Sequence, residues 1–312
     1  MYAYPIAIAL VLDFILGDPA WKWHPVRLFG NFAAQVETTC RKLPLHPSVQ
    51  GFLFFILTVF LSGTPIALFV FFTPSGNPFA LLARGIVIYF ALGGTCLVRE
   101  VSAVGDALCE SGLEGGRRKV AMLVSRDVAE MDEHDVISSS IETLAENFSD
   151  SACATLFYAA LGGPLLAWIH RMANTLDAMV GYKTPEYREF GFVSARFDDI
   201  MNLLPARISA LLIALVSPTV KGNFRMTCER ARAEGNALSS PNAGYPIAAF
   251  AGALQIRLCG PTRYFGVFFE KPFIGFGKRP DSTHLKQAIQ LYWNVYALAS
   301  VLAILLGGIV NP

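Results

Sequence analysis

The amino-acid sequence predicts an all-α, polytopic integral membrane protein, and both its hydrophobicity and the placement of its charges indicate this class. Of its 312 residues, 54% are hydrophobic and only 16% are charged, whereas about 25% of the residues in a typical soluble domain are charged. No Asp, Glu, Lys or Arg occurs in residues 43–83 or in residues 287–312. Because a helix crosses a bilayer with roughly 20 apolar residues, both runs are long enough to span a membrane.

The two uncharged runs predict three membrane spans. The first run forms a hairpin of spans 51–72 and 79–98, because the turn-rich residues 73–78 divide it. The second run predicts a span at 288–310. A large soluble protein with buried helices is the alternative, and it is disfavoured because residues 51–61 have no polar face to turn toward water.

A polar helical segment at residues 99–150 is predicted to lie in the cytoplasm. Arg41, Lys42 and Arg99 flank the hairpin, so the positive-inside rule places both of its ends on that side. The segment carries 12 acidic and 5 basic residues, which makes it the most polar part of the chain.

Two further apolar segments, 151–169 and 204–220, are ambiguous. The loop between them, 171–203, carries Arg171, Lys183, Arg188 and Arg196 and is therefore also expected in the cytoplasm. We expect a re-entrant or protein-buried pair of helices, because charge and broken helix at membrane depth are tolerated where they line a cavity. Two conventional crossings remain the alternative. All segments are assigned to one membrane-embedded domain, 1–312.

Several function classes are disfavoured by the composition. A net charge of +1 supplies no excess of cations for nucleic acid. The six cysteines show neither zinc-ligand spacing nor a disulfide framework. The glycine-rich stretch Gly112–Lys119 lacks the spaced Gly-Lys-Ser/Thr of a phosphate-binding loop, and it is interpreted as a solvated turn.

Five polar clusters adjoin the apolar segments. In the first, Pro19 and Pro25 stiffen a loop that carries Asp18, His24 and Arg27. The others are Ser125-Arg126-Asp127 with the acidic stretch that follows it, Asn174 with Asp177 and Lys183, residues 195–207, and the turn-rich loop 239–246.

The acidic stretch has the most regular spacing of these clusters. Glu142, Glu146 and Asp150 recur at i, i+4 and i+8, so one helix face would hold all three carboxylates. With Asn147 they offer hard oxygen ligands of the kind that magnesium prefers. A solvated helix face is the competing interpretation. In the fourth cluster, Arg196 and Arg207 bracket Asp198, Asp199 and Asn202, which suits a phosphorylated or otherwise anionic ligand.

These clusters, in this order, strongly resemble the CobD/CbiB family of cobalamin biosynthesis, the adenosylcobinamide-phosphate synthases. The matching motifs are Leu12-Asp-Phe-Ile-Leu-Gly-Asp-Pro19, His24-Pro-Val-Arg27, Ser125-Arg-Asp127, Glu142-Thr-Leu-Ala-Glu-Asn147, Asn174-Thr-Leu-Asp-Ala-Met-Val-Gly-Tyr-Lys183, Ala195-Arg-Phe-Asp-Asp199, Pro205-Ala-Arg207 and Ser240-Pro-Asn-Ala-Gly244. The family pattern differs at Ser151, Thr155 and Ile247, where Gly, Pro and Glu are usual.

The resemblance implies a ligase of the bacterial cytoplasmic (inner) membrane with its active site facing the cytoplasm. It would join aminopropanol or aminopropanol phosphate to the ring D propionate of cobyric acid, a corrinoid, through an ATP-dependent acyl phosphate and with Mg²⁺. Membrane lipid surrounds such a protein, and association with other membrane enzymes of cobalamin assembly is a further expectation.

The resemblance also implies roles for individual residues. Catalytic roles fall to five carboxylates, Glu142, Glu146, Asp177, Asp198 and Asp199. Metal ligation falls to Glu146, Asp150 and Asp199. Substrate binding falls to a larger polar set, Asp18, His24, Arg27, Ser125, Arg126, Asp127, Asn147, Asn174, Lys183, Arg196, Asn202, Arg207 and Asn242. The alternative function is that of a non-catalytic, AmpE-like membrane sensor or regulator, and a transporter is a weaker third hypothesis.

Overall fold

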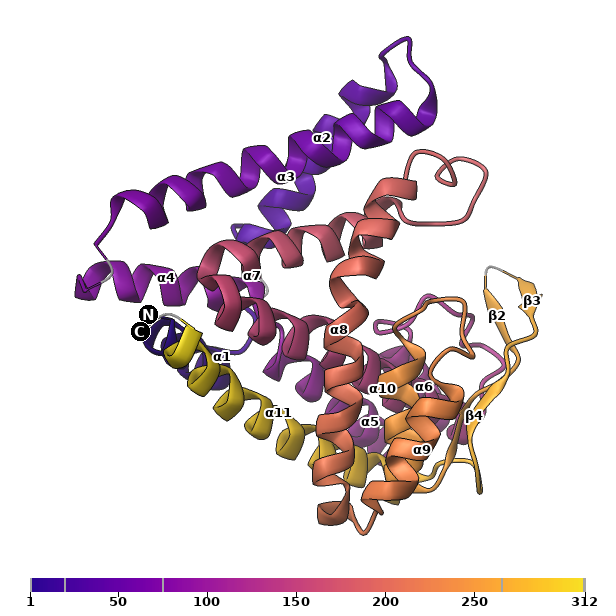
Figure 1. Cartoon of the computed structure of the whole chain (residues 1–312). Coiled ribbons are helices and arrows are strands. Elements are labelled where there is room, and N and C mark those ends of the chain that lie inside the picture. Colours follow the sequence, from indigo (N-terminus) through magenta and orange to yellow (C-terminus); the bar gives the residue numbers. More distant parts are fainter. Residues whose placement is uncertain (1, 20, 75, 265, 311–312) are drawn as a thin grey trace. The chain divides into compact units, whose positions relative to one another are not determined.

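The computed structural model describes residues 2–19, 21–74, 76–264 and 266–310, and helices dominate it (Figure 1). The elements in chain order are α1 (Ala3–Leu16), α2 (Pro25–Arg41), α3 (Pro47–Phe72), α4 (Pro78–Ala91), α5 (Thr95–Val120), α6 (Glu133–Asn147), the π-helical turn η1 (Phe148–Cys153), α7 (Ala154–Val180), α8 (Phe192–Val216), the 3₁₀ turn η2 (Ser217–Val220), α9 (Phe224–Glu234), α10 (Gly244–Leu254), β1 (Arg257–Cys259), β2 (Thr262–Tyr264), β3 (Val267–Phe269), β4 (Phe273–Gly275) and α11 (Ser282–Val310). The predicted helical class is confirmed.

The four short strands were not predicted. β1 pairs antiparallel with β4, and β2 pairs antiparallel with β3, which forms a small hairpin. Strands of three residues leave almost no periodic signal in a sequence, because alternation needs about four residues or more to be recognised.

Among the described residues, five helical stretches are long and apolar enough to cross a membrane, which confirms a multi-pass membrane protein. They are Pro47–Phe72, Pro78–Val120, Glu133–Val180, Phe192–Val220 and Ser282–Val310. The predicted spans 51–72 and 288–310 each lie within one helix, α3 and α11.

The predicted span 79–98 is not one continuous helix, and its assignment as a membrane span stays a prediction. Helix α4 ends at Ala91, Leu92 is extended, and α5 begins at Thr95. Gly93 and Gly94 lie at the break, where their low helix propensity favours interruption. The span also contains Arg84, which is only 3% exposed. Its guanidinium donates hydrogen bonds to the carbonyls of Val70 (3.2 Å) and Thr73 (2.8 Å). A cation at the C-terminus of α3 is electrostatically favourable.

Two other helices are interrupted at glycines. Helix α7, which contains residues 154–169 of the ambiguous segment 151–169, breaks at Gly162 and Gly163, directly before Pro164. The expectation of a re-entrant or buried helix pair stays a prediction. In α5 only Gly112 leaves helical geometry, with φ 65°. The interpretation of Gly112–Lys119 as a solvated turn is therefore wrong beyond its first residue, because the helix resumes and buries its next two glycines.

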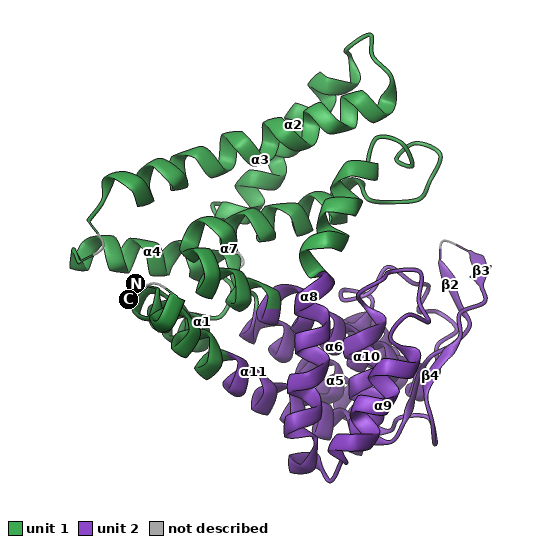
Figure 2. Ribbon diagram, viewed as in Figure 1, with its two compact units in different colours: residues 1–93, 154–202, 300–312 green, residues 94–153, 203–299 purple. Residues whose placement is uncertain are grey.

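The chain divides into two compact units, each made of segments that are distant in the sequence (Figure 2). Unit 1 comprises residues 1–93, 154–202 and 300–312, and unit 2 comprises residues 94–153 and 203–299. The single domain 1–312 stays a prediction beside this division.

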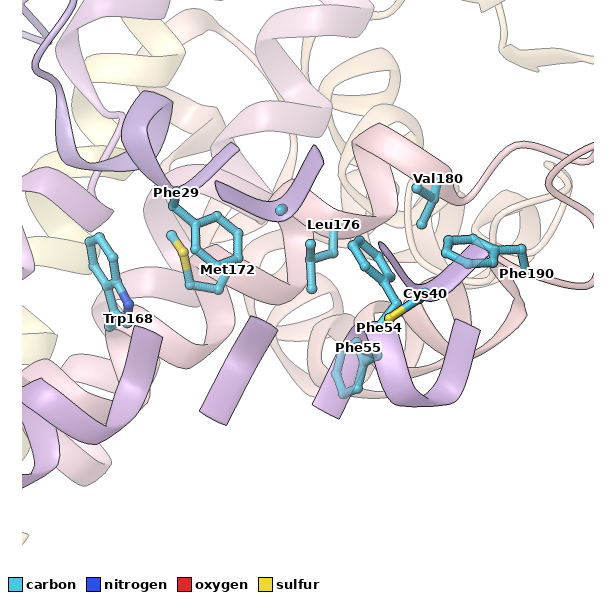
Figure 3. Packing of buried hydrophobic residues seen from close by; sticks show 10 residues of the cluster. Phe29, Cys40, Phe54, Phe55, Trp168, Met172, Leu176, Val180 and Phe190 are labelled. Carbon is cyan, nitrogen blue, oxygen red and sulfur yellow. The ribbon is translucent and has the colours of Figure 1, made fainter. Parts of the chain in front are cut away.

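The core of unit 1 joins α2, α3 and α7 through large apolar side chains (Figure 3). Phe29 of α2, Phe54 of α3 and Met172 of α7 are at most 4% exposed. Phe190, in the loop before α8, completes this core because α3 has a glycine opposite it. A Cβ atom on Gly51 would meet the carbonyl oxygen of Phe190 at 1.9 Å.

We expect Gly51→Ala to destabilise unit 1, because a methyl group overlaps the backbone of Phe190. Overpacking of this kind costs about 1–3 kcal/mol. The midpoint of thermal unfolding in detergent measures the effect. Gly30→Ala on α2 is the matched control, because a Cβ there meets no atom within 4 Å and alanine favours a helix. Equal midpoints for the two variants would contradict the close approach.

Candidate functional site

The predicted site residues occur in both units. Unit 1 holds Asp18, His24, Arg27, Asn174, Asp177, Lys183, Arg196, Asp198, Asp199 and Asn202. Unit 2 holds Ser125, Arg126, Asp127, Glu142, Glu146, Asn147, Asp150, Arg207 and Asn242. Each group is described within its own unit.

In unit 1, helices α7 and α8 bring predicted carboxylates together. Asp198 of α8 is 8% exposed, and its Oδ1 accepts hydrogen bonds from the side-chain amides of Asn202 (3.0 Å) and Asn174 of α7 (3.4 Å). Asp177 and Asp199 lie close enough to act on Asp198 electrostatically. Residues about 20 positions apart in the sequence therefore form one acidic cluster with neutral amide donors.

His170 belongs to this cluster, and the sequence analysis missed it. The side chain is fully buried, and its Nε2 lies 3.0 Å from Oδ1 of Asn202. Because Asn202 donates its amide to Asp198, its oxygen must accept, so Nε2 of His170 carries the proton. A signal was available, since residues 170, 174 and 177 are spaced i, i+4 and i+7 on one helix.

Cations border the acidic cluster on its exposed side. Nη1 of Arg196 lies 3.9 Å from Oδ2 of Asp199, and Lys183 also acts on Asp199 electrostatically. The tight turn before Lys183 depends on Gly181, because a Cβ there would meet the backbone carbonyl oxygen of Asp177 at 2.7 Å. Unit 1 thus combines carboxylates with cationic side chains of the kind that bind phosphate groups, as the sequence predicted.

The first predicted cluster also forms in unit 1. Nε2 of His24 lies 2.7 Å from Oδ1 of Asp18, and its Nδ1 accepts a hydrogen bond from the backbone of Val26, which caps α2. Burial lowers the pKa of His24, and Arg171 and Arg27 lower it further, while Asp18 opposes them. Arg171 of α7 was not predicted as part of this cluster.

In unit 2, Arg126 and Glu142 form a buried ion pair. Nη2 of Arg126 lies 2.8 Å from Oε2 of Glu142, and the Glu142 side chain is 5% exposed. Oε1 of Glu142 accepts hydrogen bonds from Oγ of Ser138 (2.7 Å) and from the backbone N–H of Cys259 (3.0 Å). Burial opposes the charge of Arg126, but Glu142 outweighs it and raises the pKa of the guanidinium. One carboxylate therefore joins the 121–132 loop, α6 and β1.

A pocket of about 510 Å³ opens beside this ion pair. Its walls are the loop residues from Arg126 to Met131, one face of α6, and the β1–β3 region. Asp127 attaches the β2–β3 hairpin, because its N–H donates to the Arg263 carbonyl (2.9 Å) and its Oδ2 accepts from the Gly266 N–H (2.7 Å). Ser125 does not line the pocket and is exposed.

A capping box and ion pairs with Arg279 fix the N-terminus of α6. Asp132 and Asp135 form a capping box, and Arg279 donates to both oxygens of Asp132 at 2.7 Å. Burial acts to raise the pKa of Asp132, but hydrogen bonds from Arg279 and from the Asp135 backbone outweigh it and lower that pKa. This anchor sets the position of the α6 residues that line the pocket.

The acidic stripe at the end of α6 differs from its predicted geometry. Glu142 and Glu146 both lie on α6, but Asp150 falls in the π-helical turn η1. A π-helical turn bonds i to i+5, so the predicted face i, i+4, i+8 does not extend to Asp150. Asn147 donates its side-chain amide to the Thr143 carbonyl at 3.0 Å.

The predicted metal ligands stay a prediction. Glu146 and Asp150 belong to unit 2, and Asp199 belongs to unit 1. Within the described residues, no three His, Cys, Asp or Glu side chains form a group that could hold a metal ion.

Arg207 and Asn242, which were predicted from separate clusters, meet in unit 2. Nη1 of Arg207 donates to Oδ1 of Asn242 at 2.8 Å, and its guanidinium stacks 4.0 Å from the ring centre of Tyr245. The contact attaches the loop 239–246 to helix α8.

A family model described as "CobD/Cbib protein" matches residues 6–292, a range that includes every predicted site residue. The chain belongs to the CobD/CbiB family. Three relatives named "Cobalamin biosynthesis protein CobD" illustrate the similarity. The relative from Clostridium perfringens is 37% identical over 88% of each chain. Those from Listeria monocytogenes and Mycobacterium tuberculosis are each 36% identical, over 94% and 97% of this chain and 95% of each relative. No solved structure matches the chain.

We expect Glu142→Gln and Arg126→Met each to destabilise this CobD/CbiB protein by about 3 kcal/mol, because each leaves a buried charged partner without its counter-ion. The double variant should lose much less than the sum, since it removes both charges. Thermal unfolding midpoints of the four proteins in detergent form the double-mutant cycle. Additive losses would contradict a coupled pair.

We expect the stability difference between the wild type and Asp132→Asn to depend on pH. Asparagine caps a helix as well as aspartate does, so the variant removes mainly the ion pair with Arg279. Because the folded-state pKa of Asp132 is lowered, the pair stabilises the fold above the unfolded-state pKa of about 3.9 and this contribution is lost as the pH falls through the folded-state pKa. Unfolding midpoints at pH 7 and pH 3 measure the difference, which should shrink at pH 3; a constant difference would contradict the assignment.

Proposed function

We propose that this protein works in cobalamin biosynthesis as an acid–amine ligase. It joins the ring D propionate carboxylate of cobyric acid to aminopropanol or aminopropanol phosphate and yields cobinamide or its phosphate. The observation that carries the proposal is the family match over residues 6–292, together with relatives named for cobalamin biosynthesis over nearly the whole chain. An AmpE-like sensor is not favoured, because the relatives carry the biosynthetic name.

A carboxylate is a poor acyl donor, so the reaction needs activation. ATP would supply a phosphoryl group that turns the propionate into an acyl phosphate, and Mg²⁺ would neutralise phosphate charge. The side chains of unit 1 fit a magnesium ion with its phosphate, because aspartate oxygens lie beside Lys183 and Arg196. Magnesium in such sites is held by one or two carboxylates and by substrate phosphates, so a complete protein cage is not required.

We assign the residues of unit 1 as follows. Asp199 holds the metal ion, and Lys183 and Arg196 bind phosphate oxygens. Asp198 accepts the proton that the ammonium group of the amine must lose before its nitrogen attacks the acyl carbon. Asn174 and Asn202 orient Asp198, as their hydrogen bonds to Oδ1 indicate. The amine nitrogen forms the new bond to carbon, phosphate leaves with the electron pair of the broken C–O bond, and the leaving phosphate takes the second proton that the nitrogen loses.

We further propose that the protein lies in the bacterial cytoplasmic membrane with this site on the cytoplasmic side. ATP and the polar corrinoid are both available there, and basic residues flank the first hairpin. Association with other membrane enzymes of cobalamin assembly belongs to the same proposal, because neighbouring enzymes in one membrane can pass a product directly from one to the next.

We expect membranes that contain the protein to form the amide from cobyric acid, aminopropanol phosphate, ATP and Mg²⁺. Asp198→Asn should lower kcat about 10²–10⁴-fold, the usual contribution of a positioned acid–base group. Chromatography of the corrinoid products measures both. Glu229→Gln is the control, because Glu229 is exposed and pairs with Arg225 of its own helix. Absence of amide with the wild type, or full activity of Asp198→Asn, would overturn the respective assignment.

A further inference from the structure

The pocket of unit 2 has the size of a small-substrate site. At about 510 Å³ it falls within the usual range of ligand pockets. A corrinoid, with its four-pyrrole ring and peripheral amides, is far larger than this volume. The pocket therefore suits one of the small reactants of the proposed ligase reaction.

The charges that line the pocket favour a cation. Four carboxylates line it and only two guanidinium groups: Asp127, Glu130, Asp135, Glu142, Arg126 and Arg263. Arg126 and Glu142 neutralise each other at 2.8 Å, and Asp135 is paired with Arg279 at 2.6 Å, so Asp127 is the carboxylate that chiefly attracts a cation. A nucleotide triphosphate would meet repulsion in such a lining, whereas an ammonium ion would be attracted.

The remaining walls suit a short carbon chain with a polar end. Ser138, Ser139 and Thr262 supply hydroxyl groups, and Val128 and Phe268 supply apolar surface. Arg263 is half exposed at 51%, and its only charged partner in the described structure is Glu130 at 3.5 Å. Such a weak pair is easily exchanged for a ligand.

We propose that this pocket binds the amine co-substrate before the amine reacts. The amine is a small primary ammonium ion that carries a hydroxyl or phosphate group, with Asp127 as the counter-ion of the ammonium and Arg263 as the group that recognises the phosphate. The inference rests on the proposed ligase function and deepens it. Arg263 then determines how strongly the enzyme prefers the phosphorylated amine to the free one, because a guanidinium binds phosphate through charge-assisted hydrogen bonds that a hydroxyl cannot match.

Steady-state kinetics with 1-amino-2-propanol and with its O-phosphate test this assignment. Arg263→Gln should raise the KM of the phosphate about tenfold and leave the KM of the free amine nearly unchanged. Asp127→Asn should raise both KM values about tenfold, and it keeps an oxygen that can accept from the Gly266 N–H. Neither variant should change the KM of ATP or of cobyric acid.

Arg257→Gln and Glu270→Gln are the matched controls. Arg257 lies on the neighbouring strand β1 and is exposed, and Glu270 directly follows β3 and is exposed; neither lines the pocket. Both should leave all KM values unchanged. Unfolding midpoints equal to that of the wild type establish that Arg263→Gln and Asp127→Asn are folded.

The failures of the two proposals are distinguishable. If the wild type forms amide but Arg263→Gln affects both amines equally, or if either pocket variant changes the KM of ATP instead, the pocket assignment is overturned and the ligase remains. If the wild type forms no amide, the ligase proposal fails. Calorimetric titration of the purified wild type, Asp127→Asn and Arg263→Gln with each amine then decides the pocket alone, and equal or absent binding in all three overturns it.

Discussion

The cost of burying charge in an apolar protein is the constraint on which both units depend. Glu142 shows this most clearly, because its carboxylate is almost fully buried and receives hydrogen bonds from Arg126, Ser138 and the Cys259 backbone. A buried carboxylate without such partners would be strongly unfavourable. Satisfying it brings a loop, a helix and a strand to one point, and the pocket of unit 2 lies beside that point.

Unit 1 meets the same constraint with neutral donors. Asp198 receives side-chain amides from Asn174 and Asn202, and the fully buried His170 orients the second of them. Amides satisfy the oxygens of a carboxylate without neutralising it in an ion pair, so its field stays available to a bound cation. Arg84 is a buried cation, and neutral groups satisfy it in the same way: the carbonyl oxygens at the end of α3 accept its hydrogen bonds.

Interrupted helices accompany these polar groups. The chain leaves α-helical geometry at Gly112 and at Gly162–Gly163, and a π-helical turn separates Glu146 from α7. Such turns occur often at functional sites, since they redirect side chains that a regular helix would hold in register. In a multi-pass protein, broken helix is tolerated where protein buries it or where it lines a cavity.

The sequence by itself determined the helical membrane class, the helices over 51–72 and 288–310, and the membership of the motifs, because hydrophobic run length and local spacing express these directly. Only the tertiary structure decided which motif residues meet. Asp177 approaches Asp198, Cys259 approaches Glu142, and His170 joins a cluster that local spacing merely hinted at. The break of span 79–98, the short strands and the position of Asp150 also emerged only there. The physical reason is range: helical periodicity relates residues three or four positions apart, whereas pairing of buried charges and strands relates residues that are distant in the chain.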